Sequence, residues 1–332
     1  MLHPVWPKRL DAASLPVAAL ATVLLASGCG SGGGDDSGAS PTPSARYVPI
    51  EVGVSDPKLA PPVPAPPCDP SRSLTPAGPP RAGAMPAGST MRTIQDRGRL
   101  VVGVDQNTRM FAAPAEETGK LEGFDIDLAR EVAKAIFGDA DRVQFKTIPP
   151  GRRIDVLLKN EVDMVVDAMT ITCERRQQVD FSAVYLEDAL RFLAPKHANV
   201  QSLDDLAGKY VCVSSNTTPE RRVAESKAKV YAVSDRTDCL VALQEGRVAA
   251  AYTNASLLES LREQDPKLEV TGPTTVEEVK GIAIPKGQDD FVRFLNAVLE
   301  RMKTDGTWRD LYKRWLAPSL GPADPPATTY RD

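Results

Sequence analysis

The stretch VDMVVDAMTITCERRQQVDFS, residues 162–182, begins as a buried strand and ends in polar side chains. Its first part is a short apolar run, typical of sheets covered on both faces. Hydroxyls at Thr170 and Thr172 and a guanidinium at Arg175 follow directly. Because ligands bind beyond the carboxyl ends of parallel strands, this stretch predicts one wall of a ligand site, where Arg175 would grip a carboxylate. The alternative is a solvated helix start at residues 174–176.

Strands and helices alternate on both sides of this stretch. Residues 124–138, FDIDLAREVAKAIFG, form an amphipathic helix with Gly138 as its stop. The other segments in this series are strands at 99–104, 143–148, 229–233 and 248–254 and helices at 238–246 and 255–264. This alternation predicts an α/β fold, with mainly parallel sheets flanked by helices.

The first 28 residues have the pattern of a secretory signal. Lys8 and Arg9 precede the apolar run LPVAALATVLLA, which is too short for a comfortable membrane span. ASGC, ending at Cys29, resembles a bacterial lipobox, which implies lipidation of that cysteine; the alternative is a plain cleavage site. Residues 29–89 are rich in Gly, Ser and Pro and are expected to form a tether.

Composition excludes several functional classes. The 332 residues carry a formal charge of -4, and no basic stripe suggests nucleic acid. With only two histidines, most metal sites and histidine-based triads are ruled out, and we expect neither a metal nor a cofactor. Besides Cys29 there are four cysteines, which allow three disulfide pairings, and none forms a CxxC redox motif.

Six segments together resemble a known family. They are GRLVVGVDQNT, GKLEGFDIDLAREVAK, residues 162–182, LDDLAGKYVCVSS, KGIAIPKG and DGTWRDLYKRWL. In this order they resemble family 3 extracellular solute-binding proteins, the polar amino-acid receptors of ABC importers. CDPSRSL, TCERR and TDCLVALQ are most similar to actinobacterial glutamine/glutamate-binding lipoproteins.

The resemblance implies a two-lobed periplasmic-binding-protein fold of type II. The first lobe would comprise residues 90–184 and 281–317, and the second residues 190–275. Hinges would lie at 185–189 and 276–280, with a flexible tail at 318–332. We expect disulfides Cys212–Cys239 within the second lobe and Cys68–Cys173 between the tether and the first lobe.

The resemblance also implies a set of ligand-binding residues. Arg175 would take the ligand α-carboxylate, helped by Thr170 and the backbone beside it. The full set is Asp105, Arg109, Arg152, Asp167, Ala168, Met169, Thr170, Arg175, Ser214, Thr217, Thr218 and Asn254.

Asn254 departs from the family, which usually has an aspartate there for the ligand ammonium. Asp167 or Asp105 would then supply the missing charge. Arg109 or Arg152 would meet a second carboxylate, favouring glutamate or aspartate over glutamine or asparagine; alternatively both are surface arginines.

Three functions remain open at this stage. The first is a monomeric, lipid-anchored extracytoplasmic receptor for ABC import, with no enzymatic activity. The second is a sensor that signals amino-acid supply through a membrane protein. The third, which we place last, is a dehydratase-like enzyme using Asp105 and Asp167 as acid and base.

Overall fold

The computed structural model describes residues 65–78, 81–272 and 277–331. The predicted signal segment, Cys29 and the tether up to residue 64 lie outside the described residues. Within the described part, no helix is both long and apolar enough to cross a membrane.

The first lobe is built on a sheet of order β5-β2-β6-β14-β7. The apolar run of residues 162–182 supplies β6, which lies parallel to β2, while β14 returns antiparallel to β6 and β7. Their bounds are β2 Leu100–Val104, β5 Val143–Thr147, β6 Met164–Val165, β7 Val179–Phe181 and β14 Ala283–Pro285. A short hairpin, β3 Ala113–Pro114 with β4 Leu121–Glu122, follows β2.

Helices cover this sheet as the apolar periodicity predicts. α2 (Phe124–Phe137) ends at Gly138, whose φ of 77° is the left-handed conformation that glycine adopts without strain. The remaining helices are α1 Thr90–Arg97, α3 Arg153–Leu158, α4 Arg175–Gln178, α8 Asp289–Thr304, α9 Thr307–Trp315 and α10 Ala317–Leu320, with a 3-10 turn at Pro150–Arg152 before α3. Phe124 of α2 and Trp308 of α9 pack edge to face in the core of this lobe.

The second lobe has the sheet order β10-β9-β11-β8-β12. The bounds are β8 Leu186–Pro195, β9 Tyr210–Ser214, β10 Lys229–Val233, β11 Ala250–Asn254 and β12 Leu268–Thr271; the helices are α5 Thr218–Ala224, α6 Asp238–Gln244 and α7 Ala255–Arg262, with a 3-10 turn at Asp204–Leu206. β9 runs parallel to β10 and β11, whereas β8 is antiparallel to its neighbours.

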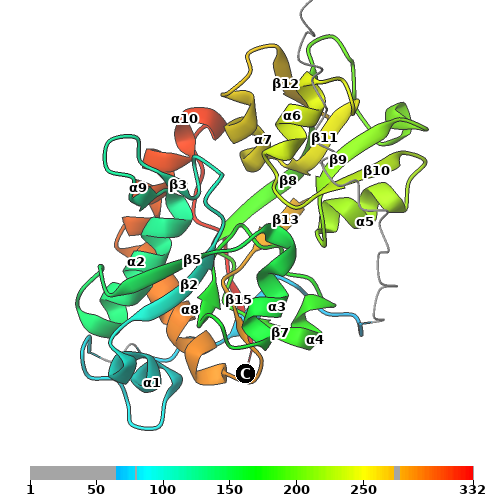
Figure 1. Cartoon of the computed structure of the whole chain (residues 1–332). Helices are drawn as coiled ribbons and strands as arrows, with labels where there is room; N and C mark the ends of the chain where they lie inside the picture. The colour runs from blue at the N-terminus through cyan, green and yellow to red at the C-terminus, as the bar shows by residue number, and fades with distance from the viewer. Residues whose placement is uncertain (1–64, 79–80, 273–276, 332) are drawn as a thin grey trace, which may run out of the picture. The chain divides into compact units, whose positions relative to one another are not determined.

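Two strands join the lobes. β8 is long, and its first residues, Leu186–Ala189, pair antiparallel with β13 (Glu277–Lys280). Figure 1 shows β13 beside the lower part of β8, between the two sheets. The crossing strands bring residues from both lobes and from β13 close together.

Both expected disulfides are formed, Cys68–Cys173 and Cys212–Cys239. The chain next to Cys68 is more regular than the tether prediction implied, because β1 (Arg72–Leu74) pairs parallel with β15 (Thr329–Arg331). The flexible tail predicted at 318–332 is therefore corrected at both ends, for residues 318–320, which belong to α10, and for residues 329–331. Asn296 of α8 donates from Nδ2 to Leu74 O at 2.6 Å, which fixes β1 on the first lobe.

Candidate functional site

Residues at the ends of β2 and β6 form the lobe-1 wall of the candidate site. Asp105 follows β2 directly and Asp167 lies two residues beyond β6. Ala168 has a positive φ of 39°, uncommon for a residue with a side chain. Its N–H donates to Asp125 Oδ2 at 3.0 Å, and Tyr185 donates its hydroxyl to the other oxygen at 3.1 Å. Asp125 thus holds the backbone on which Asp167 is presented.

A guanidinium from the second lobe reaches this wall. Arg236 follows β10, and its Nη1 donates to Thr108 Oγ1 at 2.9 Å and lies 3.2 Å from Asp105 Oδ2. Its Nη2 donates to Asp167 Oδ1, also at 3.2 Å. On the other side of Asp167, Arg153 Nη1 donates to the Asp167 carbonyl at 2.9 Å. We call Asp105, Thr108, Arg153, Asp167 and Arg236 the cross-lobe cluster.

Burial shapes the charges of this cluster, since every member is at most 6% exposed. Burial raises the pKa of Asp167, while Arg236 and Arg153 counteract it. Burial lowers the pKa of the Arg236 guanidinium, but Asp105 and Asp167 raise it, and the net shift is upward. The cluster therefore joins the two lobes by charge-assisted hydrogen bonds, the stronger kind in proteins.

A second buried group lies where β13 crosses between the lobes. Lys280 Nζ donates to Thr170 Oγ1 at 2.7 Å, to Asn254 Oδ1 at 2.8 Å and to Glu278 Oε2 at 2.9 Å. Thr170 Oγ1 and Asn254 Nδ2 both donate to that same Glu278 oxygen, at 2.6 and 3.1 Å. Glu278 and Lys280 face the same way because they are two residues apart on one strand. We call these four residues the hinge cluster.

Arg175 lies beside the hinge cluster. Its Nη1 donates to the Thr170 carbonyl at 2.7 Å, and the residue is 8% exposed. Burial and the nearby charge of Arg153 lower the pKa of its guanidinium to about 9, against the attraction of Glu278. A buried guanidinium in this state is stabilised by any anion brought to it.

A cavity of about 440 Å³ opens between the lobes next to these groups. We call it the interlobe cavity. The first lobe contributes Thr170, Ile171, Thr172 and Glu174, the second lobe Thr218, Arg221 and Arg222, and β13 contributes Glu278 and Val279. Arg221 forms an ion pair with Glu174 across the boundary. The cavity therefore has cationic, anionic and hydroxyl groups in its lining.

The structure separates the predicted site residues into groups. Asp105 and Asp167 meet in the cross-lobe cluster, Thr170 and Asn254 in the hinge cluster, and Thr170 and Thr218 in the interlobe cavity. Met169, Ser214 and Thr217 make hydrogen bonds within the protein. The Met169 carbonyl accepts from Gly281 N, and Thr217 Oγ1 donates to the Ser214 carbonyl and caps α5.

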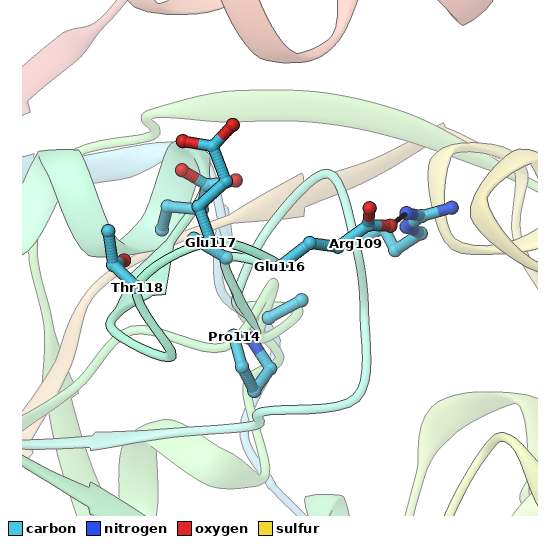
Figure 2. A pocket seen from close by; sticks show the side chains of 8 residues that line it. Arg109, Pro114, Glu116, Glu117 and Thr118 are labelled. Atoms are coloured by element: carbon cyan, nitrogen blue, oxygen red, sulfur yellow. Dashed lines mark hydrogen bonds and ion pairs between the residues drawn. The ribbon is translucent and has the colours of Figure 1, made fainter. Parts of the chain in front are cut away.

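Arg109 and Arg152 are not brought to either cluster. Arg109 forms an ion pair with Glu116 at 2.6 Å, beside a separate cavity of about 490 Å³ at the β3–β4 hairpin, as Figure 2 shows. Arg152 pairs with Asp155 at 2.7 Å. Both side chains are half exposed or more. Their carboxylate partners belong to this chain, which matches the surface-arginine alternative.

Sequence reasoning missed Arg236, Arg153, Glu278 and Lys280. A signal existed for Arg236, which stands in SDRTDC directly after the strand KVYAV. The rule that selected Asp105 and Asp167, polar residues at the carboxyl ends of strands, would have selected it too. The pair on β13 gave no such signal, because a charged residue on a strand is usually at the surface.

Comparisons with family models, with related sequences and with solved structures all point to one family of binding proteins. The model of bacterial extracellular solute-binding proteins, family 3, matches residues 100–318. The ABC transporter glutamine-binding protein GlnH of Bacillus subtilis is 34% identical over 230 residues, covering 68% of this chain and 84% of that protein. The glutamine-binding protein of Geobacillus stearothermophilus is 33% identical over 210 residues, covering 62% and 80%.

Among solved structures, the solute receptor for L-cysteine of Neisseria gonorrhoeae superposes with a TM-score of 0.67 at 28% identity, covering 70% of this chain and 96% of that one. These relatives are named as binding proteins or receptors. The chain belongs to the bacterial extracellular solute-binding proteins of family 3.

Proposed function

We propose that this extracytoplasmic binding protein closes its two lobes on a polar amino acid of the glutamine and glutamate group and delivers it to an ABC permease. As a member of a family of binding proteins it holds its solute without chemical turnover. Two relatives named glutamine-binding protein support this group of ligands, and a Pseudomonas aeruginosa relative at 26% identity is named L-glutamate/L-aspartate-binding protein.

The interlobe cavity is the observation that carries the proposal. Both lobes and β13 line it, and about 440 Å³ is within the usual range for small-molecule sites. A free amino acid carries a carboxylate and an ammonium, and the lining offers guanidiniums at Arg221 and Arg222 and a carboxylate at Glu278. Arg175 is not among the lining residues, but it lies beside Thr170, which is, and we assign the ligand carboxylate to its guanidinium.

The sequence favoured glutamate and aspartate on account of Arg109 and Arg152. Those two arginines are engaged by Glu116 and Asp155 at the surface, so they do not support a choice between acid and amide ligands. Asn254 is engaged as well, by Lys280 and Glu278. The counter-charge for the ligand ammonium is therefore assigned in this proposal to one of the carboxylates that line the cavity, Glu174, Glu225 or Glu278.

We also propose that Cys29 is lipidated and that the residues after it tether the folded part to the outer face of the cell membrane. The signal-like segment and the ASGC sequence support this. Replacing Cys29 with Ser should move the protein from the membrane fraction to the soluble fraction. Retention of the variant in the membrane would contradict the lipid anchor.

A thermal-shift screen tests the receptor function directly. The detergent-solubilised protein is stripped of ligand by unfolding and refolding, and its melting is measured against each of the twenty amino acids. A ligand at about 100 times its Kd adds about 2.7 kcal/mol of stability. We expect a shift with members of the glutamine and glutamate group, lost in Arg175→Gln and kept in the surface control Arg109→Gln. If no amino acid raises the melting temperature, the proposal fails.

A further inference from the structure

A segment that precedes the family-matched region forms part of the interlobe cavity. The family model begins its match at residue 100, whereas Pro70 lines the cavity together with Cys173. Two residues before Pro70, Cys68 is joined to Cys173 by a disulfide. The rim of the cavity is therefore built in part by a segment outside the family match, and this segment is bonded covalently to one of the cavity walls.

Hydrogen bonds hold the same segment against the first lobe. Arg176 Nη2 donates to the Pro70 carbonyl at 3.1 Å and to the Arg72 carbonyl at 2.7 Å. Asp69 Oδ1 accepts from Ser71 N at 2.9 Å, which closes the turn just before β1. The segment is therefore fixed beside the cavity by side-chain and backbone contacts as well as by the disulfide.

The wall that the disulfide holds carries groups used for the ligand and for contact between the lobes. On one side of Cys173, Thr172 Oγ1 accepts from the N–H of Arg175 at 3.2 Å. On the other side, Glu174 pairs with Arg221 of the second lobe. The helix that begins at Arg175 has only four residues, and so short a helix has little stability of its own. The position of this wall therefore depends on what is attached to it.

The second disulfide provides a contrast within the same chain. Cys212 and Cys239 are 0% and 4% exposed and belong to the core of the second lobe. Neither of them lines the interlobe cavity. Cys68, in contrast, is exposed. One disulfide is thus at the cavity and accessible to a reductant in solution, whereas the other is buried away from the cavity.

We propose that the Cys68–Cys173 disulfide positions the cavity wall for the ligand, so that ligand binding and the oxidised state of this bond stabilise each other. This proposal rests on the proposed function, which places the ligand in the same cavity. When the bond is reduced, the wall at Thr172–Arg175 loses its covalent attachment, and its conformational freedom must be given up when the ligand binds. Coupling of this kind typically changes affinity by about 5- to 150-fold, and it is reciprocal.

Ligand affinity without the bond is the first test. Calorimetric titration compares the stripped, full-length protein with the double variant Cys68→Ser/Cys173→Ser, using the amino acid that gives the largest shift in the melting screen. We expect the Kd of the double variant to be about tenfold higher. The titration is run far below the melting temperature of either protein, so that a general loss of stability does not enter the Kd. An unchanged Kd overturns the proposal.

The reduction potential of the bond gives a readout that a merely structural disulfide would not change. The unmodified protein is equilibrated with mixtures of reduced and oxidised dithiothreitol, with and without saturating amino acid, and free thiols are alkylated and identified by mass spectrometry. Each disulfide that is reduced takes two electrons and two protons from the dithiol, which becomes a cyclic disulfide. A tenfold coupling lowers the potential of Cys68–Cys173 by about 30 mV when the ligand is bound.

Cys212–Cys239 is the internal control in the same samples. Because this bond lies away from the cavity, the ligand should leave its potential unchanged in the mixtures where circular dichroism shows that the protein is folded. An equal shift at both disulfides overturns the proposal, since the ligand would then act on the fold as a whole.

The outcomes also separate this proposal from the receptor function. If the amino acid binds but does not shift the potential of Cys68–Cys173, the bond is only a structural tie, and the receptor function stands. If the double variant does not fold, the potential of the unmodified protein decides the question alone. If none of the twenty amino acids binds to the oxidised protein, the receptor function is overturned and this proposal with it.

Discussion

The hinge cluster and the cross-lobe cluster are both buried and ionic, but they differ in how far their polar groups are engaged. Lys280 is fully buried, and its ammonium meets three acceptors within 2.9 Å. In the cross-lobe cluster, by contrast, Asp167 Oδ2 finds no donor among the residues that the structure describes. Fully satisfied ionic groups fix a structure, whereas a buried acceptor without a hydrogen bond costs free energy, here offset only by the Arg153 guanidinium 3.7 Å away.

The two clusters also differ in what holds them together. The hinge cluster is fixed by β13, which carries both Glu278 and Lys280 and pairs along β8. The cross-lobe cluster depends on Arg236, which follows β10 in the second lobe and contacts residues of the first lobe. Opening the lobes would separate Arg236 from its partners but would leave the Glu278–Lys280 pair on its strand.

Removing Lys280 should have the largest effect. Lys280→Met leaves Glu278 buried without its cation, and breaking a buried pair in this way costs about 3–5 kcal/mol. The free energy of unfolding from urea titration measures the loss. The double variant Lys280→Met/Glu278→Gln should recover much of it, because neither charge remains. A single variant as stable as the unmodified protein would mean that the pair is not a structural support.

The support beneath the cross-lobe cluster should depend on pH. Burial raises the pKa of Asp125 to about 7 from 3.8. The folded state therefore holds the proton over a range in which the unfolded chain has lost it. The protonated Asp125 contributes its full stabilisation below the pKa that this residue has in the unfolded chain, and the contribution is lost as pH rises through about 7. We therefore expect the free energy of unfolding to fall by about 2–3 kcal/mol between about pH 5 and pH 8.

Urea titrations across that range, on the unmodified protein and on Asp125→Asn, check this dependence. The variant has no carboxyl to titrate at this position, so its stability should decline less with rising pH. Equal slopes for the two proteins would show that Asp125 keeps an ordinary pKa in the folded state.

Loss of Arg236 should act on lobe closure. Arg236→Gln removes charge-assisted hydrogen bonds from the closed form, each worth about 1.5–3 kcal/mol when buried. Because the freed carboxylates gain water on opening, we expect a shift near the lower end of that range, toward open molecules. Small-angle scattering without ligand should then give a larger radius of gyration. Arg109→Gln, at the surface pair with Glu116, should leave the radius unchanged.

The Arg221–Glu174 pair should have the smallest effect. It also crosses the lobe boundary, but its side chains are 37% and 30% exposed. Exposed pairs contribute about 0–1 kcal/mol and weaken with salt. Arg221→Gln should therefore change the radius of gyration little, and not at all in about 1 M salt. If Arg221→Gln increased the radius of gyration as much as Arg236→Gln, the difference in burial between the two contacts would not determine their contributions to closure.

Local features of the fold were predictable from the sequence. The helix that stops at Gly138 and the alternation of strands and helices depend on neighbouring residues, and so does the placement of Asp105 and Asp167 after their strands. The hinge cluster was not predictable in this way, because Thr170 and Lys280 are 110 positions apart. Their contact follows from an antiparallel bridge between Thr170 and Lys280 themselves, a long-range pairing that apolar periodicity does not encode.

The strand at residues 329–331 was not predicted for the same reason, because its partner is distant in the sequence. Residues 329–331 read as a polar tail after a proline-rich stretch, and no local pattern marks them as a strand. They pair because α8 and the disulfide at Cys173 hold β1 beside them. Arg72 of β1, the register partner of Thr329, lies 257 positions earlier in the sequence. Arg109 and Arg152 lie outside both clusters for a related reason, because each pairs with a carboxylate of its own segment.

The Cys68–Cys173 disulfide determines where a mechanical load would enter the molecule. Tension on the chain before Cys68 passes through the sulfur bridge to Cys173, ahead of β1 and α1. Pro70 and Cys173 also line the interlobe cavity. A protein pulled or held from that end is therefore held at the rim of its own cavity, and the covalent bond keeps drag on the chain from peeling β1 away from β15.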